Sequence, residues 1–476
     1  MMSKQETFYE KYIRKPDPVQ PQTIRKNRHT ENNRGRKQQA ETRIDNGKNR
    51  FEHCSARVRS SAQTRLYRRP YNSGKPVFST LTPEAKKILA HFHDILDRVL
   101  PLDSKKKNFL PQHIHRLFHE LTDERSCRKA HYLNNPVKLS AYAYYYVWWN
   151  LVRLTKLLQN IDLSLDDGDY AADLGSGPLT FVCALWIAKP ELRTKRLTWY
   201  CVDISNRALH FGEELFLALC AYTGRTVSAE ETPWQIKKVC GHFGTSLTEK
   251  VSLVTEANMF NEIFWNSPLS LEEQAEKAER VIVQYIKPHG SVLLIEPGIP
   301  LAGEFLSLMR TLFLQKGFSI NAPCPHNGIC CFPNSKQRNG TAERPVAYNK
   351  WCHFTFETDD SPKNLLHLSE AAKLGKERAS LSFLFCSVHS AGTVGQERHV
   401  IPVRICSDII MPAPQTIGRY ACSEKGFMLI TSPLHKKSIL NTAVSGALLM
   451  LPADDIKLHD RDKKTNALLV QLRSSL

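Results

Sequence analysis

The 476-residue sequence lacks any uninterrupted apolar run near the ~20 residues that a membrane-spanning helix needs, which argues against a helical membrane protein. Its N-terminal end is polar and charged, without the apolar stretch of ~7–15 residues found in secretory signals. No internal repeat is visible. Thirteen cysteines without an export signal predict reduced thiols rather than a disulfide framework. We expect a cytoplasmic protein, or a protein of the mitochondrial matrix if its source is eukaryotic.

The positive charge is concentrated near the start of the chain. Residues 1–75 hold 19 of the 65 Lys and Arg but 7 of the 47 Asp and Glu, so they carry +12 of the net charge of +18. A polar segment with few apolar residues cannot bury enough surface to offset the entropy of ordering it. We therefore predict a basic, disordered arm over residues 1–80 that attracts a polyanion such as RNA. A solubilising tail or a targeting peptide is the alternative.

Two helical patterns follow over residues 81–165. Apolar residues between Pro83 and Leu100 recur with the 3.6-residue period of a helix. Residues 138–160 form a second pattern that is rich in Tyr and Trp. An aromatic run at helical spacing is typical of a buried face, although it would also suit base stacking. We predict an N-terminal helical region whose aromatic side chains pack in the core.

Strand-like and helix-like segments alternate over residues 166–320. The expected strands are 170–174, 196–202, 251–257 and 291–295, and the expected helices are 178–188, 206–221, 271–286 and 302–316. This alternation predicts an α/β domain with a doubly wound parallel sheet. Ligands of such a sheet bind at the carboxyl ends of its strands.

The remainder of the chain has a different character. Residues 321–435 are rich in cysteine and proline at first and then contain short β-like runs at Ser380–Val388, Val400–Ile405 and Phe427–Thr431. We predict an irregular cysteine-bearing insert followed by a small β-rich C-terminal region. Residues 436–476 are expected to form a C-terminal tail.

A glycine-bearing loop closes the first expected strand of the α/β domain. Gly175 and Gly177 let the backbone approach a ligand and adopt positive φ, and the next helix offers its N-terminal N–H groups. Asp173 is placed to accept a hydrogen bond from a ligand amine, and Asp203, at the end of the second strand, would accept both hydroxyls of a ribose. A dinucleotide fingerprint would need a third glycine, which this loop lacks. The pattern predicts a nucleoside pocket; the alternative is a tight glycine turn.

Two further strand ends carry polar residues. Asn258 and Glu296 are candidates for contacts with the adenine or with an acceptor, although polar residues are also common on surface loops. The sequence has no Asn-Pro-Pro-Tyr or Asp-Pro-Pro-Tyr motif to hold the amino group of a base, and no obvious cysteine nucleophile for cytosine C5 chemistry. The pattern therefore predicts cofactor binding but identifies no catalytic residue.

The cysteines of the later module lie on loops, where burial in a helix or strand does not explain them. They are Cys324, Cys330, Cys331, Cys352, Cys386, Cys406 and Cys422. Thiolates that converge there would bind an iron–sulfur cluster or zinc, although the C-x5-C spacing is not the C-x2-C pair of a zinc ribbon. Only one of the adjacent Cys330 and Cys331 is expected to be a ligand, and His326 or His353 could complete a mixed site. In contrast, Cys183, Cys201 and Cys220 are predicted to be small buried hydrophobes.

These motifs resemble, in their order, those of the mitochondrial-type small-ribosomal-subunit methyltransferase-like assembly factors. The motifs are D-L-G-S-G-P, N-M-F-N-E-I, L-I-E-P-G, C-P-H-x3-C, W-C-H-F and a late C-x3-G, and the resemblance covers roughly residues 135–435. The glycine loop with its late Asp also resembles that of class I methyltransferases. The resemblance implies a class I methyltransferase-like fold that binds S-adenosylmethionine through Asp173, Gly175, Ser176, Gly177, Asp203 and Asn258.

The resemblance also implies a four-iron, four-sulfur (4Fe-4S) cluster, with zinc as the alternative. The ligands implied by motif position are Cys324, Cys330, Cys352 and Cys422, with Cys406 or Cys386 as substitutes for the last. Cys331 stands where the family usually has proline, so either Cys330 or Cys331 could be the ligand.

In function, the resemblance implies a methyltransferase-like protein, monomeric and without a membrane partner, that acts on or near small-subunit rRNA in ribosome assembly or translation. The alternative is a non-catalytic rRNA-binding assembly factor with a vestigial pocket. A radical S-adenosylmethionine enzyme is disfavoured because C-x3-C-x2-C is absent.

Overall fold

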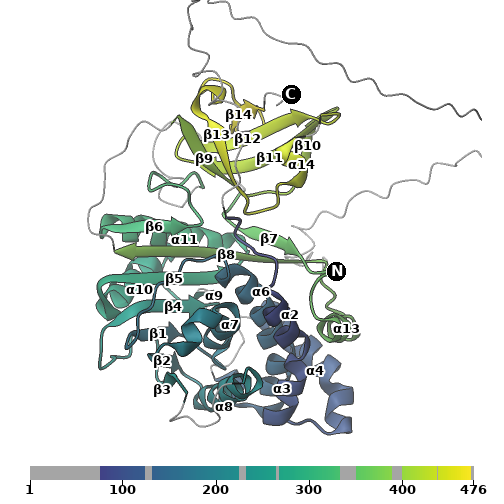
Figure 1. Ribbon diagram of the computed structural model, residues 1–476, viewed down its shortest axis with the longest axis vertical. Coiled ribbons are helices and arrows are strands. Elements are labelled where there is room, and N and C mark those ends of the chain that lie inside the picture. The colour runs from purple at the N-terminus through teal and green to yellow at the C-terminus, as the bar shows by residue number, and fades with distance from the viewer. Residues whose placement is uncertain are drawn as a thin grey trace, which may run out of the picture. The chain divides into compact units, whose positions relative to one another are not determined.

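The computed structural model describes residues 75–123, 131–224, 232–263, 267–332, 350–388, 399–436 and 438–472. Nearly all of the basic arm expected over residues 1–80 lies outside this part of the chain. Among the described helices, none combines the length and the apolar character needed to cross a bilayer. Figure 1 labels the helices and strands.

The segments before the sheet are helical. They are α2 (Pro83–Ala90), α3 (Phe92–Val99), α4 (Ser104–Thr122), η2 (Tyr132–Asn134), α5 (Pro136–Ala141), η3 (Tyr142–Val147) and α6 (Trp148–Leu158). Helix α2 begins where the side chain of Thr82 accepts a hydrogen bond from the backbone N–H of Ala85. The aromatic run lies in η3, a π-helical segment, and in α6, where Tyr145 and Trp148 are fully buried. The predicted packing of these aromatic side chains in the core is confirmed.

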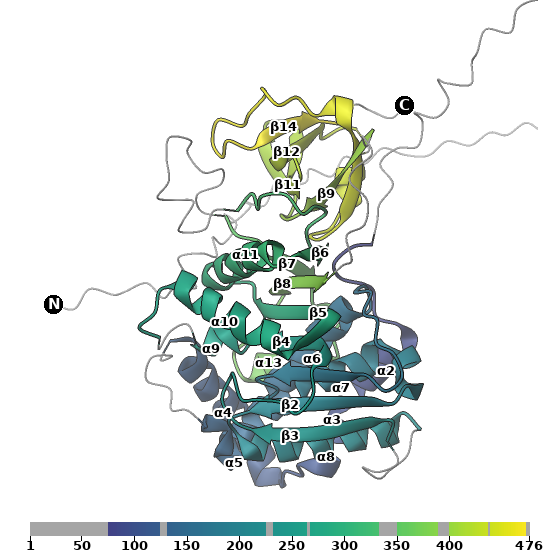
Figure 2. The ribbon, with the colours of Figure 1, turned by 90° about the vertical axis from the view of Figure 1, so that its left-hand side faces the viewer.

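The main sheet has the strand order β3-β2-β1-β4-β5-β8-β6, with β7 paired to β8. Its strands are β1 (Tyr170–Leu174), β2 (Leu197–Asp203), β3 (Trp234–Cys240), β4 (Val251–Ala257), β5 (Ile286–Pro297), β6 (Phe318–Ala322), β7 (Phe354–Glu357) and β8 (Arg378–Val388). Neighbours from β3 to β5 are parallel, whereas β8 is antiparallel to β5 and β6. Figure 1 shows the strands in this order, and Figure 2 also shows β3 at one edge. The predicted doubly wound, class I methyltransferase-like sheet is confirmed.

Helices cover both faces of this sheet. They are α7 (Thr180–Ala188), η4 (Pro190–Thr194), α8 (Asn206–Tyr222), α9 (Phe260–Ile263), α10 (Leu271–Tyr285) and α11 (Pro300–Gln315), and α13 (Lys363–Ala371) follows β7. Because successive strand residues point to opposite faces, Trp199 and Cys201 pack with α6, α7 and α8, while Tyr200 and Val202 pack with α10 and α11. Cys183, Cys201 and Cys220 are fully buried in the first of these cores, as predicted.

Four strands of the main sheet differ from the sequence prediction: β3, β6 and β7 were not predicted, and β8 was assigned to another region. The edge strand β3 was not predicted, because Lys237 and Lys238 interrupt its apolar residues and one side of it is exposed. The run Ser380–Val388 was assigned to the C-terminal β-rich region, but it forms most of β8 and lies between β5 and β6. Its residues from Leu381 to Ser387 are all buried, which a strand inside a covered sheet requires.

A second sheet contains the C-terminal strands in the order β13-β9-β11-β12-β14, with β10 paired to β11. Its elements are β9 (Val400–Ile405), β10 (Ile410–Ala413), β11 (Thr416–Ser423), β12 (Gly426–Pro433), α14 (Ile439–Thr442), β13 (Leu448–Pro452), η6 (Ala453–Asp455) and β14 (Leu468–Gln471). The range expected as a tail from residue 436 therefore supplies two strands: β13 pairs with β9, and β14 pairs with β12. Both carry alternating buried side chains that close the core of this sheet.

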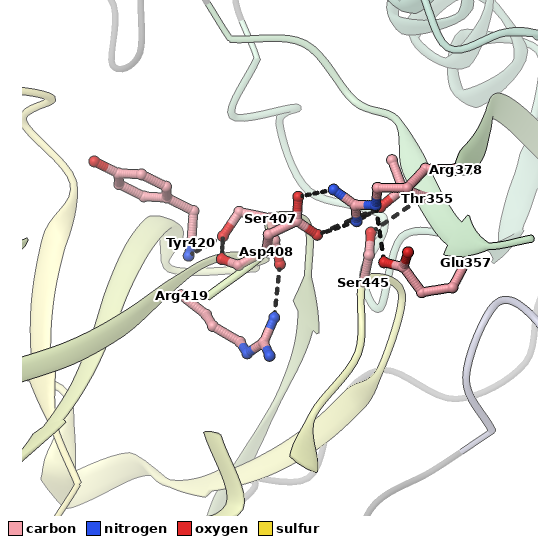
Figure 3. Close-up of polar contacts among 8 residues, drawn as sticks. All are labelled: Thr355, Glu357, Arg378, Ser407, Asp408, Arg419, Tyr420 and Ser445. Carbon is pink, nitrogen blue, oxygen red and sulfur yellow. Dashed lines mark hydrogen bonds and ion pairs between the residues drawn. The ribbon is translucent and has the colours of Figure 1, made fainter. Parts of the chain in front are cut away.

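An ion-pair network joins the two sheets (Figure 3). Arg378, the first residue of β8, donates to both carboxylate oxygens of Asp408, and its Nε lies 2.9 Å from Glu357 Oε1. The backbone N–H of Thr355 donates to Ser445 Oγ at 3.1 Å. The hydrogen bonds from Arg378 lower the pKa of Asp408. We call the Arg378–Asp408 pair the inter-sheet clamp.

Candidate cofactor pocket and cysteine cluster

The glycine loop is held against the end of β2 by backbone hydrogen bonds. The N–H groups of Gly175 and Ser176 both donate to the carbonyl of Val202, at 2.8 and 3.0 Å. Gly175 has φ +68° and Gly177 has φ +49°, both in the left-handed region that favours glycine. The sequence therefore predicted correctly that these positions need conformational freedom.

The two glycines have different surroundings. A Cβ atom on Gly175 would lie 2.6 Å from Cβ and Cγ of Met259, so the side chain of Met259 occupies the space that a larger residue would need. A Cβ atom on Gly177 would meet no atom within 4 Å. Gly175 is thus required by packing, whereas Gly177 borders open space.

Asp203 ties the end of β2 to this loop. Its Oδ2 accepts a hydrogen bond from the backbone N–H of Gly177 at 2.9 Å, and its Oδ1 accepts one from the N–H of Ser205 at 2.7 Å. Burial raises the pKa of this carboxyl above its ordinary value. Each oxygen keeps a second lone pair, so the side chain can accept further hydrogen bonds from a ligand.

Asp173 lies deeper, at the end of β1, with 1% of its surface exposed. Its Oδ1 accepts from Thr255 Oγ1 at 2.8 Å, while its Oδ2 is buried and has no hydrogen-bond partner within the described part of the chain. Burial raises the pKa of Asp173 to about 7. Ser176 turns inward as well, and its hydroxyl donates to the carbonyl of Asp173 at 2.7 Å. An unpartnered buried carboxyl oxygen is costly unless a ligand group meets it.

Asn258 follows β4 with φ +69°, and its backbone N–H donates to Ile295 O at 2.8 Å. Its side-chain Oδ1 accepts from Nη2 of Arg153 at 2.7 Å. Arg153 projects from α6 and also donates to the carbonyl of Ser380 at 3.2 Å. Arg153 was not predicted as a site residue from the sequence. It could have been noticed as a cation within the apolar and aromatic helix 148–158.

Glu256 and Glu296 end the adjacent strands β4 and β5, and both are fully buried. Oε1 of Glu256 accepts from the backbone N–H of Met259, and both oxygens of Glu296 accept from the N–H of Asn261 at 3.1–3.2 Å. Burial raises the pKa of each carboxyl, and the neighbouring charge raises that of Glu256 further. The raised pKa values favour a protonated carboxyl in this pair, and the hydrogen bonds that the pair accepts fix the turn into α9.

The structure brings cysteines from distant parts of the chain close to one another. Cys422, on β11, lies near enough to interact electrostatically with Cys324, Cys330, Cys331, Cys352 and Cys406. It is also 3.6 Å from Nε2 of His326. The four cysteines implied as ligands are thus neighbours, together with Cys331 and Cys406. We call this group the cysteine cluster.

The pKa values of the thiols in the cysteine cluster are shifted in different directions. Burial raises the pKa of the Cys324 and Cys352 thiols. A hydrogen bond from Cys331, followed by the effects of His326 and Arg310, lowers the pKa of Cys422, so this residue is the preferred thiolate. Nε of Arg310, on α11, donates to Cys324 Sγ at 3.3 Å. Arg310 was also missed from the sequence.

Two other candidates lie elsewhere. Cys386, on β8, packs with α10 and α11, and burial alone raises its pKa, with no contribution from another thiol. Nδ1 of His353 is hydrogen-bonded to the carbonyl oxygen of Trp351, and the imidazole stacks on the indole ring of the same residue. Within the described ranges, no group of three or more His, Cys, Asp or Glu side chains is arranged to hold a metal ion.

Comparison with known proteins places these residues in a family context. Residues 141–407, more than half of the chain, match the family model described as mitochondrial small ribosomal subunit Rsm22. No curated protein matches the sequence significantly.

Similar solved structures include S-adenosylmethionine-dependent methyltransferases from Thiobacillus denitrificans and Geobacter sulfurreducens, each in complex with S-adenosyl-L-homocysteine. The first is 13% identical to this chain, covers 51% of this chain and 91% of its own, and has a TM-score of 0.28. The second is also 13% identical, covers 58% of this chain and 98% of its own, and has a TM-score of 0.27. A methyltransferase from Pyrococcus furiosus is 12% identical, with 47% and 77% covered and a TM-score of 0.25.

Proposed function

Because this chain belongs to the family of mitochondrial small ribosomal subunit Rsm22, we propose that it is a methyltransferase-like protein that binds S-adenosylmethionine and an iron–sulfur cluster and acts on or near small-subunit rRNA. The cofactor assignment rests on one observation above all. The carboxylate of Asp203 is bonded to the N–H of Gly177 beside open space, at the carboxyl ends of β1 and β2. Ligands of doubly wound sheets bind at this place.

The chain's own residues supply the contacts that this cofactor needs. Asp203 would accept the ribose hydroxyls with its remaining lone pairs, and Gly177 would let the backbone approach the ligand. Asp173 would meet the amine of the methionine part with its unpartnered Oδ2; an ammonium group there favours the charged carboxylate that burial opposes. The cofactor, when bound, supplies a methyl group on a cationic sulfonium. The protein would then need to orient an acceptor in line with that group.

A second candidate function is a non-catalytic assembly factor with the same pocket. The arrangement of Glu256, Glu296 and Asn258 favours it, because at least one oxygen of each side chain already accepts a hydrogen bond from a backbone N–H group or from Arg153. In this case the cofactor would stabilise the fold for binding to rRNA rather than react.

The iron–sulfur part of the proposal rests on the chemistry of the donor set. Cys324, Cys330 and Cys352 are half-buried and Cys422 is buried; all four interact electrostatically, and Cys331 or Cys406 could replace one of them. Thiolates crowded in a buried site repel one another unless a cation is present, and Arg310 supplies one positive charge. A zinc ion would need its ligands ~2.0–2.3 Å from one point, whereas a 4Fe-4S cluster takes one thiolate at each iron. We therefore favour the cluster, in a structural role that joins β11 to the loops after β6 and before β7.

The proposed partner is the small ribosomal subunit through its rRNA. The net charge of +18 supports contacts with phosphate groups. The compartment would follow the ribosome: the cytoplasm in a bacterium, and the mitochondrial matrix in a eukaryote.

Cofactor binding is tested by calorimetry with S-adenosylmethionine and S-adenosylhomocysteine. We expect Asp203→Ala to weaken binding about tenfold or more, because a charge-assisted hydrogen bond contributes about 1.5–3 kcal/mol. Asp167→Ala is a matched control, since Asp167 pairs with Arg196 at the opposite ends of the strands. Equal affinity in wild type and Asp203→Ala would remove the pocket assignment.

The same variant separates the two functions in cells. Loss of an rRNA methylation with unchanged binding to the small subunit would identify an enzyme. Unchanged methylation, with assembly altered only where cofactor binding is lost, would identify the assembly factor. Crosslinking of the wild-type protein to RNA should map to small-subunit rRNA; crosslinks scattered over messenger RNA would exclude the ribosomal assignment.

The cluster is tested on protein purified without oxygen. We expect iron and sulfide in equal amounts and a visible absorbance that bleaches on oxidation. Zinc in place of iron would favour the alternative, and protein without metal would exclude both.

A further inference from the structure

Helix α4 carries two histidines one turn apart whose rings face each other. Nε2 of His119 lies 3.2 Å from Nε2 of His115, and the ring centroids are 4.7 Å apart with an interplanar angle of 78°. The spacing i,i+4 puts both side chains on one face of the helix. Both residues are partly exposed, so water and ions can reach the pair.

The second nitrogen of each ring fixes where its hydrogen lies. Nδ1 of His115 is 3.0 Å from the carbonyl oxygen of Ala372, and Nδ1 of His119 is 2.6 Å from Oδ2 of Asp123. A carbonyl or a carboxylate only accepts, so both Nδ1 atoms must donate. In the neutral imidazoles both Nε2 atoms therefore carry a lone pair. Two lone pairs that face each other at 3.2 Å repel unless a positive centre lies beside them.

We propose that His115 and His119 form a binding site for one divalent transition-metal ion, of the zinc, copper or nickel class. Ligand distances of ~2.0–2.1 Å at a tetrahedral centre separate two nitrogens by roughly 3.3 Å, close to the separation found here. Imidazole suits these metals, whereas Mg²⁺ and Ca²⁺ prefer oxygen ligands. The site has two protein ligands rather than three or more, and water would complete the coordination.

The surroundings of the pair are those of a metal-binding site. Metal-bound histidines regularly donate their other N–H to a carboxylate or a backbone carbonyl, and both kinds of partner are present. Ala372 caps the C-terminal end of α13, so the bond from His115 links α4 to a helix some 250 residues later in the chain. A bound ion would hold His115 in this orientation and strengthen that link.

Calorimetry with Ni²⁺ and electron paramagnetic resonance with Cu²⁺ test the proposal on the full-length chain without a polyhistidine tag. We expect His115→Gln and His119→Gln each to abolish one equivalent of binding, and the copper spectrum of wild type to show coupling to two nitrogens. His113→Gln, on the same helix, is the matched control and should bind like wild type. Asp123→Asn should bind about tenfold more weakly, because it removes an outer partner of His119.

Metal bound at the cysteine cluster is common to all of these variants and cancels in the comparison. Circular dichroism shows whether each variant is folded. Identical stoichiometry and spectra in wild type, His115→Gln and His119→Gln would overturn the site and leave a shared proton as the positive centre.

Discussion

The glycine loop and the cysteine cluster are assembled in opposite ways. Asp173, Gly177 and Asp203 belong to one strand–helix–strand unit, and backbone hydrogen bonds between adjacent parallel strands set their positions. The cysteines come from two loops around β6 and β7 and from strand β11 of the other sheet. The first arrangement needs only the local fold of the sheet. The second needs the two sheets to be docked correctly, so changes far from the cysteines should disturb it.

The largest expected effect is that of Cys422→Ser. Cys422 interacts with five other thiols and is the one whose pKa is lowered, so its loss should abolish iron binding under the cluster proposal. Metal-binding free energy is folding free energy, and the loops that carry the cysteines after β6 and before β7 should become sensitive to protease. Iron content and limited proteolysis measure the two effects.

Cys386→Ser is the matched control for Cys422→Ser. It removes an equally buried thiol that packs on the α10–α11 face, and it should cost about 1–2 kcal/mol of stability while iron stays bound. Equal iron loss in both variants would show that general destabilisation, not a ligand, explains the result.

The glycine loop gives the next largest effect. Gly175→Ala should lower the free energy of unfolding by about 2–4 kcal/mol, since it adds left-handed strain to a clash with Met259. Gly177→Ala should lower the free energy of unfolding by only about 1 kcal/mol, because its methyl group would meet no protein atom. It should weaken cofactor binding, because the methyl group would enter the open space proposed for the cofactor. Urea unfolding and calorimetry separate the two.

Met259→Ala in the Gly175→Ala background sharpens the assignment. The smaller side chain removes the contacts with Cγ and Sδ but leaves the contact with Cβ and the strain, so the double variant should lose less than the sum of the single losses. Strict additivity would mean that Met259 does not fill this space.

The same contrast explains how far the sequence predicted the molecule. Gly175, Gly177 and Asp203 were found because their signal is local: a strand, a glycine turn and a carboxylate at the next strand end. Arg153 and Met259 were missed because they meet Asn258 and Gly175, respectively, only in the folded chain. Edge strand β3 and inserted strand β8 escaped correct assignment because exposure weakens the first pattern and a long insertion separates the second from its neighbours.

The cysteines in the sequence indicated a metal or cluster site, but the sequence did not show which of them are its ligands. Cys422 was implied by motif position and Cys386 was a substitute for it, and the topology puts the two in different sheets. Cys386 lies on a central strand against α10 and α11, while Cys422 lies among the other thiols. No periodicity in the sequence carries that information. The fit of His115 and His119 to a metal ion likewise depends on Ala372, which lies more than 250 residues later in the chain.

A pH experiment tests whether the carboxyl pair beside the glycine loop is structural. Burial raises the pKa of Glu256 above its ordinary value of about 4.5, so the folded chain keeps a proton that the unfolded chain releases. Stability should therefore fall as the pH rises from about 4.5 to the higher folded value. Glu256→Gln mimics the protonated form and should be more stable than wild type by about 1 kcal/mol at pH 8. Near pH 4.5 the two should be equal, as measured by thermal unfolding; a constant difference at all pH values would contradict the shared proton.

The smallest effect on stability concerns the inter-sheet clamp, and it tests the dependence of the cysteine cluster on docking. The folded pKa of Asp408 lies below its ordinary value of 3.8, so the stabilisation is present above that value and is lost as the pH falls through the lower folded pKa. Asp408 and Arg378 are 49% and 38% exposed, so solvent screening limits the loss in Asp408→Asn to about 0.5–1 kcal/mol at pH 7. Iron release to a chelator should nevertheless be faster, because Asp408 lies just after β9, which pairs with the strand that carries Cys422. Glu357→Gln, which weakens a more exposed contact of the same Arg378, should change neither quantity measurably. If Asp408→Asn released iron at the wild-type rate, the loops that carry the cysteines would hold the cluster without help from the docking of the two sheets. The cysteine cluster would then differ from the glycine loop only in how far apart its residues lie in the sequence.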